Sequence, residues 1–183
     1  NCKLIHISTD YVFDGQAISP YKEDDIVNPQ SVYGKTKLAG EKALLELTTL
    51  AAIIIRTSWV YSQYGNNFVK TMLRLAKDRD VLSVVDDQVG APTHAKDLAR
   101  ACLDILNTTN WPKQTEIYHY SNEGSCSWCE FAKTILEFKS SRCNVLPITT
   151  EEYPTPAPRP SYSVLDKSKI KAHFNLKINT WKD

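Results

Sequence analysis

Tyr33 and Lys37 are the residues whose types and spacing could do acid–base chemistry. They lie four apart in Tyr33-Gly-Lys-Thr-Lys37, a spacing that places two side chains on the same face of a helix. A lysine ammonium beside a phenol favours the phenolate, so such a tyrosine can donate and accept a proton near neutral pH. The spacing also arises by chance. An exposed helical tyrosine, a solvated lysine and Thr9 as a strand-end cap therefore remain the alternative interpretation.

Two strands and a helix must position these residues. Residues 3–8 form a near-continuous apolar run that ends at Thr9, which predicts a parallel strand buried on both faces. Asn28 as N-cap and Pro29 in the first turn predict a helix that continues to about residue 47. A second strand is expected over residues 52–57. The side chains expected to face inward along the helix are Val32, Thr36, Ala39, Ala43 and Leu47.

Strands and helices alternate along the rest of the chain. We expect helices over about 68–79, 94–106, 127–138 and 166–173, and strands over 82–85, 116–120 and 145–148. Loops are expected at 64–67, at 87–93 and in the proline-rich stretch 153–160. This alternation indicates an α/β protein whose parallel strands are flanked by helices.

The composition excludes several classes of protein. Lys and Arg total 22 and Asp and Glu total 21, a net charge of +1, and no basic stripe indicates a nucleic-acid partner. No apolar run approaches the length of about 18 residues that indicates a membrane helix, so no membrane partner is expected. The five cysteines are an odd number spread over expected helices and strands. That pattern is typical of reduced thiols in a cytoplasmic protein.

Cys126 and Cys129 have the C-x-x-C spacing of redox and zinc sites. They lack a second ligand pair, and Ser127 with Glu130 makes a capping box for the helix that follows. We therefore interpret both cysteines as structural. The four histidines also show no metal-ligand spacing, so no metal ligands are predicted from the residues themselves.

Several blocks resemble one known family in the right order. Val32-Tyr-Gly-Lys-Thr-Lys-Leu-Ala-Gly-Glu-Lys42 resembles a signature of the extended short-chain dehydrogenase/reductases, and within them of the dTDP-4-dehydrorhamnose reductase family. Further similar blocks are residues 7–15, 56–61, 65–76, 87–93 and 153–160. The resemblance implies part of a Rossmann-type parallel sheet with a small C-terminal substrate-binding α/β part. The division it suggests is residues 1–90 for the dinucleotide-binding portion and 91–183 mainly for the sugar nucleotide, with the two parts interleaved.

The resemblance also implies a function. It is the reduction of the 4-keto group of dTDP-4-dehydro-L-rhamnose by NADPH or NADH, in the biosynthesis of dTDP-rhamnose for cell-surface polysaccharide. A dTDP-4-keto sugar is then the partner substrate, Mg²⁺ is a family-based cofactor, and a homodimer is expected. Tyr33 would donate the proton, Lys37 would lower the tyrosine pKa and hold the nicotinamide ribose, and Thr9 would hydrogen-bond the substrate oxygen.

Other roles follow from the resemblance as well. Cofactor-binding positions are Ser8, Tyr33 and Lys37, and substrate-binding positions are Thr9, Asp10, Trp59, Asn67 and Arg159.

One departure and two alternatives remain. No G-x-G-x-x-G occurs in the sequence, although the family carries this dinucleotide loop in an initial β-α-β unit. We therefore expect this chain to be a piece of a longer protein that is inactive alone. A sugar-nucleotide epimerase or dehydratase would use the same Tyr/Lys pair. A non-catalytic subunit similar to the regulatory subunit of methionine adenosyltransferase would keep the scaffold without the reaction.

Overall fold

The sheet that carries the predicted strand ends has three parallel strands in the order β1-β2-β7. The computed structural model describes residues 2–47, 49, 51–157 and 159–183. The strands are β1 (Leu4–Thr9), β2 (Ala52–Thr57) and β7 (Glu116–His119). Because the register pairs Thr9 with Thr57, the carboxyl ends of β1 and β2 are level, as the predicted site requires.

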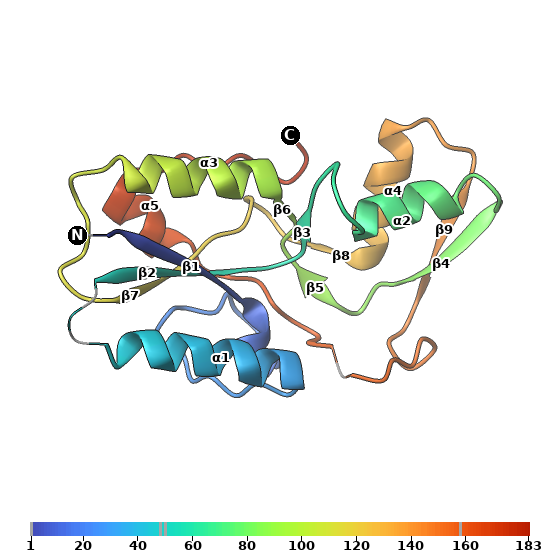
Figure 1. Cartoon of the computed structure of the whole chain (residues 1–183). Helices are drawn as coiled ribbons and strands as arrows, with labels where there is room; N and C mark the ends of the chain where they lie inside the picture. Colours follow the sequence, from blue (N-terminus) through green and yellow to red (C-terminus); the bar gives the residue numbers. More distant parts are fainter. Residues whose placement is uncertain (1, 48, 50, 158) are drawn as a thin grey trace.

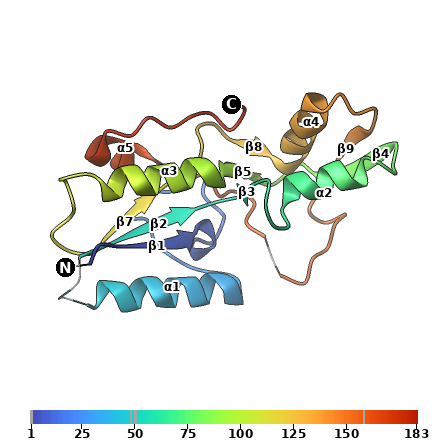
Figure 2. The same ribbon diagram turned by 45° about the horizontal axis from the view of Figure 1, so that its top comes forward.

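Helices cover both faces of this sheet (Figure 1). α1 (Val32–Leu45) lies on one face, and α3 (Ala95–Leu106) and α5 (Ser168–Phe174) lie on the other (Figure 2). β2 is buried along its whole length, as its Ala-Ile-Ile-Ile run predicts for a central parallel strand. The core between the sheet and α3 and α5 consists of Ile53, Ile55, Leu98, Ala101, Ile105, Tyr118, Tyr120 and Ile170. The predicted α/β class is confirmed.

A second, smaller lobe packs around α2 (Phe68–Leu75) and α4 (Trp128–Phe138), at the right of Figure 1. Its strands β4 (Val81–Val85) and β9 (Asn144–Ile148) pair in parallel. Two further pairs are β3 (Val60–Tyr61) with β6 (Thr93–His94), and β5 (Val89–Gly90) with β8 (Cys126–Ser127). Both lobes draw on segments before and after residue 90, so a division of the chain there stays a prediction.

The connection after β1 folds back beneath the sheet. It begins with the short 3-10 helix η1 (Asp10–Val12). Tyr21 N then donates to Val164 O at 2.9 Å, and Asp166 N donates to Tyr21 O at 2.8 Å. Phe13 stacks on Tyr21 with ring centroids 4.2 Å apart. These contacts fasten the segment that follows the proline-rich loop to the segment that follows β1.

The predicted inward face of α1 is wrong. Val32, Thr36, Ala39, Ala43 and Leu47 are exposed, and the helix turns Gly34, Lys37, Leu38, Glu41 and Leu44 toward the protein. The inward face is therefore partly polar, and specific polar contacts described below replace apolar burial. The start of α1 also differs, because Ser31 is its N-cap in place of Asn28 and the Ser31 hydroxyl accepts from Gly34 N at 3.1 Å.

β1 is less buried than predicted. Leu4 and Ile7 are partly exposed, because β1 is the edge strand of the described sheet.

α2 ends at Leu75, four residues before the predicted end near Arg79. The predicted cap of α4 is confirmed, since the Ser127 hydroxyl accepts from Glu130 N at 2.9 Å. Among the helices in the described ranges, we find none that is long and apolar enough to cross a membrane.

Candidate active site at the end of β1

Thr9 ends β1 and turns the chain into η1. Its backbone is extended (φ −142°, ψ 153°), and its Oγ1 accepts from Tyr11 N at 3.2 Å and donates to Asp10 Oδ1 at 3.0 Å. The residue is 4 % exposed. Thr9 therefore has a fixed orientation at the carboxyl end of the sheet, where open α/β sheets bind ligands.

Asp10 is a buried carboxyl group with one oxygen unsatisfied. It is 3 % exposed, and its buried Oδ2 has no hydrogen-bond partner among the described residues. Burial disfavours the carboxylate and raises the pKa of Asp10 to about 6, against the opposing hydrogen bonds from Ser163 and Thr9. Beside Thr9 there is thus a buried carboxyl group with one oxygen that the described residues leave without a partner.

Tyr33 lies on the first turn of α1 and contacts the loop after Thr9. Its ring meets the ring of Tyr11 edge-on, with centroids 5.8 Å apart, and the residue is 54 % exposed. Gly34 makes this approach possible, because a Cβ there would lie 2.2 Å from Tyr11 O. The phenol is therefore placed next to the strand end and remains accessible to a ligand.

Lys37 reaches the same strand end from the next turn of α1. Its Nζ donates to Ile7 O at 2.6 Å, two residues before Thr9. Tyr33 contacts Tyr11, two residues after Thr9. The structure therefore gathers the three predicted catalytic residues around the last residues of β1.

Ser8 is directed into the protein, toward two residues that sequence reasoning missed. Its hydroxyl donates to Glu41 Oε1, and Glu41 pairs with Arg56, whose Nη2 lies 2.7 Å from Oε2. Glu41 is 0 % and Arg56 2 % exposed. The Ser8 hydroxyl is thus engaged internally, while its predicted cofactor contact stays a prediction. In the sequence, Glu41 could have been found from its position one helical turn beyond Lys37.

Trp59 follows β2 in a strained conformation. Its φ is +48°, in the left-handed region that costs a bulky residue about 1–3 kcal/mol. The indole stacks on Trp128 with centroids 3.5 Å apart, and a Cβ on Gly90 would lie 2.5 Å from the ring. The side chain is therefore tightly held against α4 and β5.

The two remaining predicted substrate residues lie elsewhere. Asn67 caps α2, since its Oδ1 accepts from Lys70 N at 3.1 Å and its Nδ2 donates to Ser62 O at 2.7 Å. Its amide is thus used within its own loop. Arg159 is exposed and lines a small pocket with Tyr11 and Ser31 at the start of α1. Of the two, only Arg159 lies near Tyr33.

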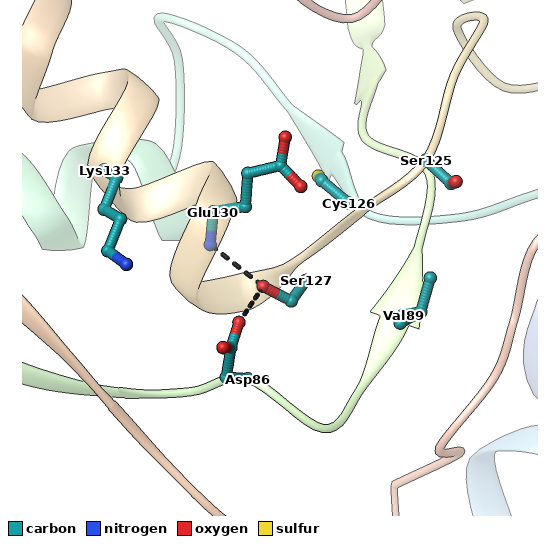
Figure 3. Close-up of a pocket in the computed structure, with 7 residues that line it drawn as sticks. All are labelled: Asp86, Val89, Ser125, Cys126, Ser127, Glu130 and Lys133. Carbon is teal, nitrogen blue, oxygen red and sulfur yellow. Dashed lines mark hydrogen bonds between the residues drawn. The ribbon is translucent and has the colours of Figure 1, made fainter.

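A wide pocket of about 480 Å³ lies at the start of α4, and no predicted site residue lines it (Figure 3). Ser127 joins its walls by donating to Asp86 Oδ1 while it accepts from Glu130 N.

Cys126 also lines the pocket, and burial raises the pKa of its thiol to about 12. Cys126 and Cys129 are free thiols, and their structural role stays a prediction. Within the described ranges no group of three or more His, Cys, Asp or Glu could hold a metal ion, so the Mg²⁺ prediction finds no support here.

Comparison with known proteins gives one consistent result. The RmlD substrate binding domain family matches residues 1–183. Among curated relatives, a spore coat polysaccharide biosynthesis protein, SpsK, of Bacillus subtilis is 50 % identical over 99 % of this chain and 62 % of its own length. A dTDP-4-dehydrorhamnose reductase of Aggregatibacter actinomycetemcomitans is 45 % identical over 99 % of this chain and 64 % of its own length.

A solved structure agrees with these relatives. The dTDP-4-dehydrorhamnose reductase of Bacillus anthracis in complex with NADP has a TM-score of 0.91 and 44 % identity, over 98 % of this chain and 62 % of that one. This chain thus spans less than two thirds of the length of these relatives. The match over its whole length shows that the chain belongs to the RmlD substrate-binding domain family.

Proposed function

We propose that the protein containing this chain reduces the 4-keto group of a dTDP-4-dehydro-6-deoxy sugar, giving dTDP-L-rhamnose, at the expense of NAD(P)H. One observation carries the proposal. The Nζ of Lys37 lies 2.6 Å from Ile7 O while Tyr33 packs against Tyr11, so an ammonium and an accessible phenol flank Thr9. The names of the relatives, several of them dTDP-4-dehydrorhamnose reductases, support the same reaction.

The residues divide the work of a ketone reduction. A nicotinamide, when bound, supplies the hydride. The carbonyl oxygen gains negative charge as the hydride arrives, so a donor must stand beside it. Tyr33 gives its hydroxyl proton to that oxygen, and the Thr9 hydroxyl donates a hydrogen bond to it after release from Asp10. Lys37, one turn further along α1, provides a positive charge at the same strand end.

The residues of this chain are suited to bind the ribose at the nicotinamide end of the cofactor. Lys37 uses one N–H on Ile7 O, and an ammonium has three N–H groups, so two can bind ribose hydroxyls. No G-x-G-x-x-G turn for the pyrophosphate occurs among these 183 residues. The NADP complex of the Bacillus anthracis relative favours NADPH over NADH. A homodimer, the cytoplasmic location and a role for Mg²⁺ stay predictions.

Substrate contacts are proposed at the same strand end. Asp10 is proposed as a substrate contact because it lies next to Thr9 and the described residues leave its buried Oδ2 without a partner. Arg159 near the start of α1 suits the diphosphate, because a guanidinium binds two oxygens at once. Trp59 and Asn67 are proposed to line the sugar-nucleotide site through the edge of the indole and the α2 cap.

The test is an assay of a polypeptide of the relatives' full length that contains residues 1–183. With NADPH and the dTDP-4-keto sugar, we expect loss of NADPH absorbance matched by formation of dTDP-L-rhamnose. The corresponding UDP-4-keto sugar is the control, because its comparison with the dTDP sugar shows whether the base of the nucleotide is recognised. An epimerase would convert substrate without net use of NADPH, and a non-catalytic subunit would do neither. Either result would refute the proposal.

A further inference from the structure

The face that α1 turns toward the sheet makes one close steric contact and polar contacts at the next two turns. Gly34 packs against Tyr11 O, and Lys37 donates to Ile7 O. One turn further on, Glu41 accepts from the Ser8 hydroxyl and pairs with Arg56. Tyr33, Lys37 and Glu41 are spaced by four residues, so they form one row along the helix.

The Ser8–Glu41–Arg56 network has the geometry of a rigid fork. Arg56 Nε donates to Glu41 Oε1 at 3.0 Å while Nη2 donates to Oε2 at 2.7 Å. The remaining Arg56 group, Nη1, donates to Glu23 O at 3.3 Å. Parallel bonds of this kind fix the relative orientation of the two planes as well as their distance. The network thus joins α1 to β1 and β2 in one orientation.

Stability alone does not explain such a pair. Removing two charges from water costs several kcal/mol per ion, so a buried pair is often no more stabilising than apolar residues of the same size. The apolar side chains of α1 that could have filled this face, such as Val32 and Ala39, point to solvent instead. An apolar face would allow the helix to turn slightly about its axis, whereas the fork does not.

We propose that the Ser8–Glu41–Arg56 network sets the rotation of α1 and so holds Tyr33 and Lys37 against the end of β1. Glu41 and Arg56 are then positioning residues for the reaction proposed above, on which this inference rests. Side chains extend about 5–6 Å from a helix axis, so a rotation of about 10° would move the Tyr33 side chain by about 1 Å. A displacement of about 1 Å can cost about 10²-fold in rate.

The decisive variant removes both charges at once. Glu41→Gln with Arg56→Met leaves no unpaired buried charge, and the new amide oxygen can still accept from Ser8. In the full-length protein we expect thermal unfolding within about 5 °C of wild type, a kcat lower by about 10–100-fold, and KM changed by less than about threefold. A matched control is Arg100→Met with Asp104→Asn on α3, an exposed pair 3.4 Å apart, which should change neither quantity.

Adding Tyr33→Phe separates positioning from a general structural role. If the network acts through Tyr33, the paired substitution should lower kcat by less than about threefold when it is added to Tyr33→Phe, because effects of coupled residues are not additive. Three results would overturn the inference alone: a paired variant with wild-type kcat, an equal loss in both backgrounds, or failure of the paired variant to fold. Wild-type turnover by Tyr33→Phe itself would refute the proton-donor role of Tyr33 and this inference with it, whereas a wild-type protein that does not consume NADPH would refute the proposed function.

Discussion

Gly34→Ala should distinguish the effect of α1 on protein stability from the effect of its placement on activity. The added Cβ would lie 2.2 Å from the backbone oxygen of Tyr11 and 3.0 Å from Pro29 Cβ. Carbon–oxygen contacts are rarely shorter than about 3.3 Å, so α1 and η1 must separate by about 1 Å. The oxygen belongs to the main chain and cannot turn aside as a flexible side chain would.

Two effects on stability then oppose one another. Replacing glycine by alanine within a helix favours the helix by about 1 kcal/mol, but inserting a methyl group into a filled space costs about 1–3 kcal/mol. We expect net destabilisation of about 1 kcal/mol. The larger effect is on activity, because the shift lies next to Tyr33 and a misplacement of about 1 Å can cost about 10²-fold in kcat.

Gly40→Ala is the matched control on the same helix. Its Cβ would meet only the His6 ring, at 3.7 Å, which is an ordinary contact. This variant should be more stable than wild type by up to about 1 kcal/mol with unchanged kcat. Urea unfolding and steady-state kinetics of the full-length variants measure both quantities. If Gly34→Ala behaved like Gly40→Ala, the close packing of α1 on η1 would not position Tyr33.

Three further predictions concern Asp10 and Lys37 at the same strand end and Gly90 beside Trp59. Asp10→Asn should become more stable relative to wild type as the pH rises from 4 to 7. The folded-state pKa of Asp10 is raised to about 6, so ionisation of that carboxyl lowers the unfolding free energy of the wild type by up to about 3 kcal/mol. A difference that is constant with pH would contradict this. Lys37→Met should lower kcat and weaken NADPH binding in calorimetry together, whereas an unchanged cofactor Kd would show that the ammonium serves only Ile7 O. Gly90→Ala should raise KM for the sugar nucleotide by displacing the Trp59 ring, with a red shift in tryptophan emission; an unchanged spectrum would refute it.

The elements could be predicted from sequence because their signals are local. The Ile-rich run of β2 and the capping serine of α4 lie next to the elements that they specify, and both predictions are confirmed. The start of α1 was missed because Asn28-Pro29 and Ser31 are both good helix starts. In the structure the Ser31 hydroxyl accepts from Gly34 N and begins the helix there.

The inward face of α1 could not be predicted from hydrophobic periodicity. Val32, Ala39 and Ala43 point to solvent, whereas Lys37 and Glu41 point inward because they have partners on β1 and β2 that lie far away in the sequence. The same holds for Arg56, which follows the Ile-rich run of β2. Catalytic residue types were recognisable from the motif, whereas the buried groups that hold them required the structure.

The measurement that tests the central claim most directly is the turnover of Tyr33→Phe in the full-length protein. With deuterated NADPH, a primary isotope effect first establishes that hydride transfer limits the rate. We predict that kcat falls by about 10²–10⁴-fold, the contribution of a positioned proton donor, while Kd values for substrate and cofactor change by less than about threefold. A kcat within about threefold of wild type under those conditions would contradict the assignment of Tyr33 as the proton donor.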